Sequence, residues 1–191
     1  FVISADGYII TNHHVAAGGN STMVKFTDGT QRIAEIVVID DEFDLALLKV
    51  KTNSPMSYVQ LAMADNPPDG SDIVIMGYPA PGRFGYTVKT TKGVVTSGNN
   101  GASGGYDVTV DAKANPGNSG GPIYNNSGHV VAVLSAGTTL TDGIINSYSL
   151  AVSAGRLRRF LNKNNITVTP GDELETPLTT QQISERNRMA T

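Results

Sequence analysis

The chain has 191 residues, of which 39% are hydrophobic and 16% charged, and its formal net charge is −3. It contains no cysteine, which excludes a disulfide scaffold, a thiolate metal site and a cysteine nucleophile. The acidic balance without a Lys/Arg stripe argues against nucleic-acid binding, and no uninterrupted apolar run reaches the roughly 20 residues of a transmembrane segment.

Short apolar or β-branched runs alternate with turn residues along most of the chain. In chain order, we expect strands at 8–10, 22–26, 33–39, 45–50, 73–76, 87–95, 108–110 and 130–134. Turn pairs such as Asp28-Gly29 and Ser127-Gly128 separate these runs. Strands spaced in this way, without helical periods between them, indicate an all-β fold built from antiparallel barrels.

Breaker residues divide the chain into lobes. The densest run of such residues, Asp-Asn-Pro-Pro-Asp-Gly at 65–70, is predicted to link a first barrel lobe at 1–64 to a second lobe at 71–165. Residues 166–191 then form a polar linker or tail.

Two helices are expected late in the chain. Leu157, Phe160 and Leu161 share one face of 153–163, so this segment is predicted to be an amphipathic helix packed on the second lobe. In the tail, Thr179 and Gln182 have the spacing of a capping box, which is typical of a short helix that begins there.

The motif Asn-Pro-Gly-Asn-Ser-Gly-Gly-Pro at 115–122 is the richest in the chain. Gly117, Ser119 and Gly121 match the nucleophile elbow of α/β-hydrolases formally, but an elbow leads directly into a helix, whereas Gly-Gly-Pro and a strand follow here. The other interpretations are a tight surface turn, or a loop whose Gly117 and Ser119 amides bind an oxyanion beside the serine hydroxyl.

A serine nucleophile needs a base and an acid. His14 ends the first predicted strand and is the candidate base, while His129 at a turn is expected to be exposed. His13 and His14 together make a poor metal site, because adjacent histidines diverge and no ligand motif accompanies them, so we expect no metal. Asp44 opens an apolar strand, where a charge needs a partner; Asp111 is the second choice.

The order His14, Asp44, Ser119 is the chymotrypsin order, and the chain resembles the trypsin-like serine proteases, in particular the HtrA/Deg group. The matching stretches are 1–15, 44–48, 77–79 and 115–122. The resemblance implies two six-stranded antiparallel barrels, the first incomplete at its N-terminus, with the site in the cleft between them.

The resemblance also implies the roles. Ser119 would attack a peptide carbonyl, His14 would carry the proton, Asp44 would orient His14, and the Gly117 and Ser119 amides would form the oxyanion hole. The expected function is a serine endopeptidase that acts on unfolded or extended polypeptides without a cofactor. The alternatives are a catalytically silent scaffold and a self-processing protease. An extracytoplasmic location is implied, and a homo-oligomer is left open.

The specificity pocket is the least defined part of the prediction. Trypsin-type enzymes place an aspartate six positions before the serine, where this chain has Lys113, so a preference for basic side chains is not expected. An extended substrate is expected to pair with the strand around 133–136. The residues expected to contact substrate are Lys113, Ala114, Ser135, Ala136 and Gly137.

Overall fold

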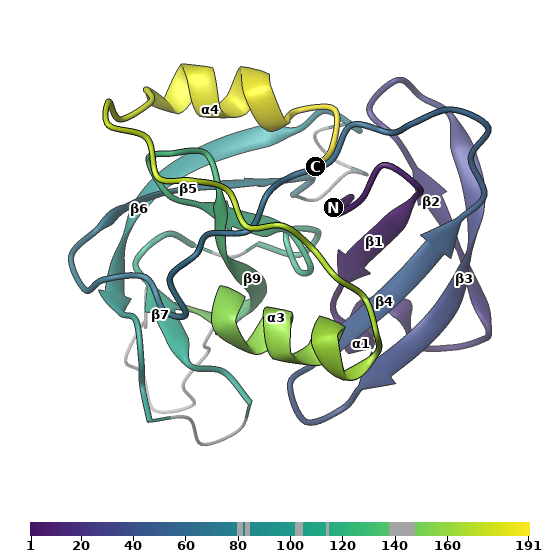
Figure 1. Cartoon of the computed structure of the whole chain (residues 1–191), viewed down its shortest axis with the longest axis horizontal. Coiled ribbons are helices and arrows are strands. Elements are labelled where there is room, and N and C mark those ends of the chain that lie inside the picture. Colours follow the sequence, from purple (N-terminus) through teal and green to yellow (C-terminus); the bar gives the residue numbers. More distant parts are fainter. Residues whose placement is uncertain (80–81, 83–84, 102–104, 114, 138–147) are drawn as a thin grey trace.

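The computed structural model describes residues 1–79, 82, 85–101, 105–113, 115–137 and 148–191. Its first lobe is an antiparallel four-stranded sheet in the order β1-β4-β3-β2 (Figure 1). These strands are β1 (Tyr8–Thr11), β2 (Ser21–Lys25), β3 (Gln31–Asp40) and β4 (Leu45–Val50). Val2 adds an isolated bridge to Ile9 in β1.

The second lobe is a closed six-stranded antiparallel barrel, in the order β10-β7-β6-β5-β8-β9. Its strands are β5 (Asp72–Gly77), β6 (Lys89–Ser97), β7 (Val108–Val110), β8 (Pro122–Tyr124), β9 (Val130–Gly137) and β10 (Ser149–Ser153). The all-β class is therefore confirmed, with one complete barrel and one lobe of four strands. The position of the linker between the lobes stays a prediction.

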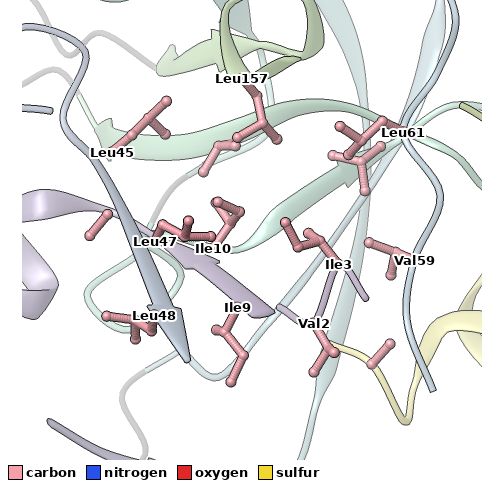
Figure 2. Close-up of a cluster of buried hydrophobic side chains, with 14 of the residues drawn as sticks. Val2, Ile3, Ile9, Ile10, Leu45, Leu47, Leu48, Val59, Leu61 and Leu157 are labelled. Carbon is pink, nitrogen blue, oxygen red and sulfur yellow. The ribbon is translucent and has the colours of Figure 1, made fainter. Parts of the chain in front are cut away.

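One hydrophobic cluster runs through both lobes. Figure 2 shows Ile10 of β1 beside Leu47 of β4 and Ile9 beside Leu48, with Leu157 from the C-terminal part of the chain directed into the same cluster. Val133 of β9 belongs to it as well. Each fully buried side chain of this size stabilises the fold by about 1.5–3 kcal/mol. Shared packing therefore fixes how the lobes sit on each other, and with it the geometry between them.

Helix α3 (Ala154–Lys163) follows β10 directly. The Ser153 side chain accepts a hydrogen bond from the Arg156 amide and so caps the helix N-terminus. Leu157, Phe160 and Leu161 are buried, as the apolar spacing predicted. The amphipathic helix is confirmed.

The tail packs against both lobes. Helix α4 (Thr180–Asn187) begins with the predicted capping box between Thr179 and Gln182 and lies beside the second barrel (Figure 1). Ile183 in this helix is fully buried. The Val2 amide donates to the Ala190 carbonyl at 2.7 Å, which fastens the end of the tail to the start of the first lobe.

His129 is buried beneath the tail, so its predicted exposure is wrong. Only 1% of the residue is exposed, and a Cβ on Gly171 would collide with its ring. The tail residues that cover the ring are distant in sequence, and no local pattern around His129 indicates them. Burial lowers the pKa of His129, and the nearby Arg186 guanidinium lowers it further, against the opposing effect of Glu173 and Asp172.

This buried histidine makes stability depend on pH. Because the folded-state pKa of His129 lies below the unfolded value of about 6.5, its stabilising effect is complete above pH 6.5 and declines as the pH falls below it. We expect wild type to lose up to about 1.4 kcal/mol per pH unit more than His129→Gln on acidification. Thermal melts of both proteins at pH 7.5, 6.5 and 5.5 measure this difference. Equal pH slopes would contradict it.

Candidate active site

The start of the short helix α1 (His13–Ala16) is tied to Asp44. Asn12, the fully buried residue before the helix, donates from its side-chain amide to the Asp44 carbonyl at 3.0 Å. The backbone amide of His13 donates to the same carbonyl at 3.1 Å. These two bonds bring His14 next to Asp44, although 30 positions separate them in the sequence.

Asp44 has an uncommon backbone conformation, with φ of 51° in the left-handed region. Aspartate and asparagine tolerate this region better than other non-glycine residues. Asp44 Oδ1 accepts from the His14 backbone amide at 3.0 Å, and its Oδ2 lies 2.8 Å from His14 Nδ1. Because a carboxylate only accepts, Nδ1 carries the proton and Nε2 is left with its lone pair. The Asp44 side chain is 14% exposed and that of His14 50%.

Two residues of the second lobe donate to Asp44. Ser135 Oγ lies 2.5 Å from Asp44 Oδ2, and Tyr106 Oη lies 3.3 Å from the same oxygen. Burial raises the pKa of the Asp44 carboxyl, but the hydrogen bonds from Ser135 and His14 outweigh it, so the pKa lies below its ordinary value. Asp44 is therefore ionised at neutral pH.

Ser119 lies in a tightly turned loop before β8. The Asn118 amide donates to the Asn115 carbonyl and the Gly121 amide to the Asn118 carbonyl, both at 2.9 Å. The Gly120 amide donates to the Leu134 carbonyl at 2.8 Å, which attaches the loop to β9. Ser119 Oγ donates to the Ser135 carbonyl at 2.6 Å. Ser135 therefore joins Ser119, through its backbone, to Asp44, through its side chain.

Two backbone amides of this loop are the candidates for the predicted oxyanion hole. Gly117 has a φ of 98°, a conformation that glycine adopts without steric cost. Within the described part of the chain, neither the Gly117 nor the Ser119 amide donates a hydrogen bond. An oxyanion hole requires amides that do not donate elsewhere, and these two meet that condition among the described residues.

Comparison with known families identifies the domain. The model of a family described as trypsin-like peptidase domain matches residues 1–133. The chain belongs to this family.

The relatives point to one branch of trypsin-like peptidases. A protein of Rhizobium meliloti (strain 1021) named "Probable periplasmic serine endoprotease DegP-like" is 40% identical over 139 residues, 71% of this chain and 27% of the relative. A protein of the same name from Pseudomonas fulva (strain 12-X) is 35% identical over 157 residues, 80% of this chain and 32% of the relative. These names confirm the resemblance to the HtrA/Deg group. The chain spans about a third or less of the length of these relatives.

The residues predicted for the site of this trypsin-like domain are only partly joined by contacts. His14 and Asp44 are hydrogen-bonded, and Ser119 reaches Asp44 through Ser135. Among the described residues, no hydrogen bond joins Ser119 to His14. Asp111 instead accepts from the Val94 amide at 2.6 Å and so fixes a strand connection.

The residues predicted to bind substrate give a mixed picture. Lys113 is exposed, and Ala114 lies outside the described residues. The backbones of Ala136 and Gly137 pair with β10 opposite Leu150 and Ser149. The Ser135 hydroxyl is bonded to Asp44, and its carbonyl accepts from the Ser119 hydroxyl.

Sequence reasoning missed Asn12, Tyr106 and the bond from Ser135 to Asp44. Asn12 could have been noticed as a polar residue between an apolar strand and the two histidines. No local sequence pattern indicates Tyr106, because it contacts Asp44 from 62 positions away in the sequence. Across the described residues, no cluster of three metal-ligating side chains is present, and no helix is long and apolar enough to span a bilayer.

Proposed function

We propose that this domain is a serine endopeptidase with Ser119 as nucleophile, His14 as base and Asp44 as orienting acid. One observation carries the proposal: hydrogen bonds link Ser119, Ser135, Asp44 and His14, although these residues come from distant parts of the sequence. An ionised Asp44 that accepts from Nδ1 keeps His14 in the tautomer that can take a proton at Nε2.

The reaction follows from these groups. Ser119 Oγ attacks the peptide carbonyl while its proton passes to His14, which then gives it to the leaving amine. Water hydrolyses the acyl-enzyme by the same route in reverse. The Gly117 and Ser119 amides stabilise the oxyanion, and each such donor typically contributes about 10²–10³-fold in rate.

The Ser119 hydroxyl must first leave the Ser135 carbonyl. A substrate amide that donates to this carbonyl would replace the Ser119 hydroxyl and free it to rotate toward His14. Binding of an extended peptide along β9 would in this way prepare the nucleophile.

The backbone available to such a peptide is shorter than expected. Val133 is paired with Pro122 of β8 and Val152 of β10, and Leu134 is bonded to the loop before β8 and to β10. The expectation that the substrate pairs from 133 onward is therefore wrong, because both edges are occupied there. We place the pairing at 135–137, with an unfolded or extended polypeptide as substrate.

Location and assembly also belong to the proposal. The relatives are named periplasmic, and we extend an extracytoplasmic location to this chain. A homo-oligomer is consistent with the resemblance stated above. A catalytically silent scaffold is the second candidate, favoured by the resting bond of Ser119 to Ser135.

Labelling with a fluorophosphonate probe and digestion of unfolded casein test the function. We expect wild type to be labelled at Ser119, as shown by peptide mapping, and to cleave casein. Ser119→Ala should do neither while keeping the wild-type circular dichroism spectrum. Ser71→Ala is the matched control and should behave as wild type, because among the described residues the Ser71 hydroxyl bonds to the Pro68 carbonyl and not to any residue of the site.

Each other outcome has a meaning. A folded wild type that neither labels nor cleaves supports the silent scaffold. Cleavage of the chain itself without cleavage of casein supports the self-processing protease. Labelling at a different serine contradicts the proposed nucleophile.

A further inference from the structure

We propose that Tyr106 is a positioning residue for Asp44, and that Arg156 holds Tyr106 and Asp44 in register across the two lobes. This inference rests on the proposed function and adds to it two residues that the sequence motifs did not contain.

The Tyr106 hydroxyl acts on the oxygen that holds the imidazole. Tyr106 Oη lies 3.3 Å from Asp44 Oδ2, the oxygen that is 2.8 Å from His14 Nδ1. The Tyr106 ring packs against the hydrophobic cluster shared by the lobes. Burial raises the pKa of Tyr106, and the effect of the Asp44 charge and hydrogen bond adds to it against an opposing effect of Ser135, so the hydroxyl stays protonated and acts as a donor.

A rigid backbone presents this hydroxyl. Gly105, just before Tyr106, has a φ of 85° and lies so close to the Glu42 carbonyl that a Cβ would collide with it. Asp107, just after Tyr106, is buried and accepts from the Ser153 amide at 2.8 Å and the Ser153 hydroxyl at 2.7 Å. The segment is thus fixed on both sides of Tyr106.

Arg156 in the first turn of α3 connects this segment to the residue before Asp44. Its Nε pairs with Asp107 Oδ2 at 2.9 Å, and its Nη1 donates to the Gly105 carbonyl at 2.8 Å. Its guanidinium also stacks on the Phe43 ring, 4.7 Å from the centroid. Arg156 therefore contacts the residues next to Tyr106 in the sequence and also the residue next to Asp44.

The chemical effect follows from the charge on Asp44. A half-buried carboxylate is stabilised by each donor it accepts from, and Ser135 and Tyr106 both donate to Oδ2. Without the Tyr106 hydroxyl, Oδ2 becomes a stronger acceptor toward His14 and loses one of the contacts that orient the carboxylate. His14 would then hold its proton more tightly, and the enzyme would turn over more slowly.

Tyr106→Phe tests this role because it removes only the hydroxyl. We expect kcat to fall about tenfold with little change in KM, and the acid limb of the pH profile of kcat/KM to move to higher pH. The His14 Nδ1 proton resonance should move downfield. Tyr124→Phe is the matched control, since the buried Tyr124 hydroxyl pairs with Thr191 Oγ1 at 2.9 Å and not with Asp44. It should change neither the pH limb nor the resonance.

Arg156→Lys tests the second half of the proposal. A lysine keeps the charge but cannot contact Asp107, Gly105 and Phe43 at once, so we expect the same displacement of the His14 resonance as in Tyr106→Phe. In the Tyr106→Phe background, Arg156→Lys should displace it no further. Additive displacements would show that Arg156 acts by another route.

The outcomes separate this inference from the proposed function. Labelling of wild type tests the function, whereas the resonance is measured without turnover. An unchanged resonance and pH limb in Tyr106→Phe, or equal effects of Tyr106→Phe and Tyr124→Phe, would overturn the positioning role even in a fully active protease.

Discussion

Asp44→Asn is expected to lower kcat about 10⁴-fold and to leave the fold intact. The fold should persist because asparagine tolerates the left-handed φ of 51° as well as aspartate does. The bonds from Asn12 and His13 to the backbone carbonyl of residue 44 do not depend on its side chain.

The loss of rate comes from the wrong imidazole tautomer. The His14 backbone amide needs an acceptor at the Oδ1 position, so the new NH₂ group must take the Oδ2 position, facing His14 Nδ1. It would donate to Nδ1 and drive the proton to Nε2, which could then no longer accept from Ser119. Steady-state kinetics of casein cleavage and thermal melts measure the two effects. A folded variant with less than about tenfold loss would rule out Asp44 as the orienting acid.

Gly120→Ala is expected to lower kcat/KM by about 10²-fold and to destabilise the fold by at least about 1–2 kcal/mol. Gly120 has a φ of 78°, and a Cβ there would collide with Thr11 Oγ1 and lie 3.0 Å from the Asn12 amide nitrogen. The loop that carries Ser119 thus rests directly on the backbone that carries His14. Pushing the two apart would displace nucleophile from base.

Gly70→Ala separates the two causes of this loss. Gly70 has almost the same φ, 77°, but a Cβ there would meet nothing within 4 Å. Because an alanine is strained at this φ, Gly70→Ala should lower the free energy of unfolding, measured in urea, by a similar amount. It should keep wild-type kcat/KM. If Gly120→Ala has wild-type kcat/KM, the contact between the lobes at Thr11 does not position the site.

The strands that could be predicted are those whose own residues favour them. Leu45–Val50 and Val108–Val110 have the predicted bounds, because apolar, β-branched residues fill them between clear turns. β8 and β10 were not predicted. Pro122–Tyr124 is only three residues long and begins with proline, and Ser149–Ser153 begins and ends with serine. Both are strands because neighbouring strands of the barrel supply their partners.

The candidate site divides in the same way. His14, Asp44 and Ser119 could be selected from local motifs, and the structure bonds His14 to Asp44 directly. Tyr106 and the Ser135 hydroxyl reach Asp44 from 62 and 91 positions away, so only the packing of one lobe on the other brings them there. The burial of His129 under the tail was missed for the same reason.

The double use of Ser135 has a consequence for how this site can change. Its hydroxyl, which holds Asp44, can be altered or removed by a single codon change. Its carbonyl, on which Ser119 rests, is the same whatever residue occupies the position. Mutation at this position can therefore change the charge environment of Asp44, while the backbone carbonyl that accepts from Ser119 is kept.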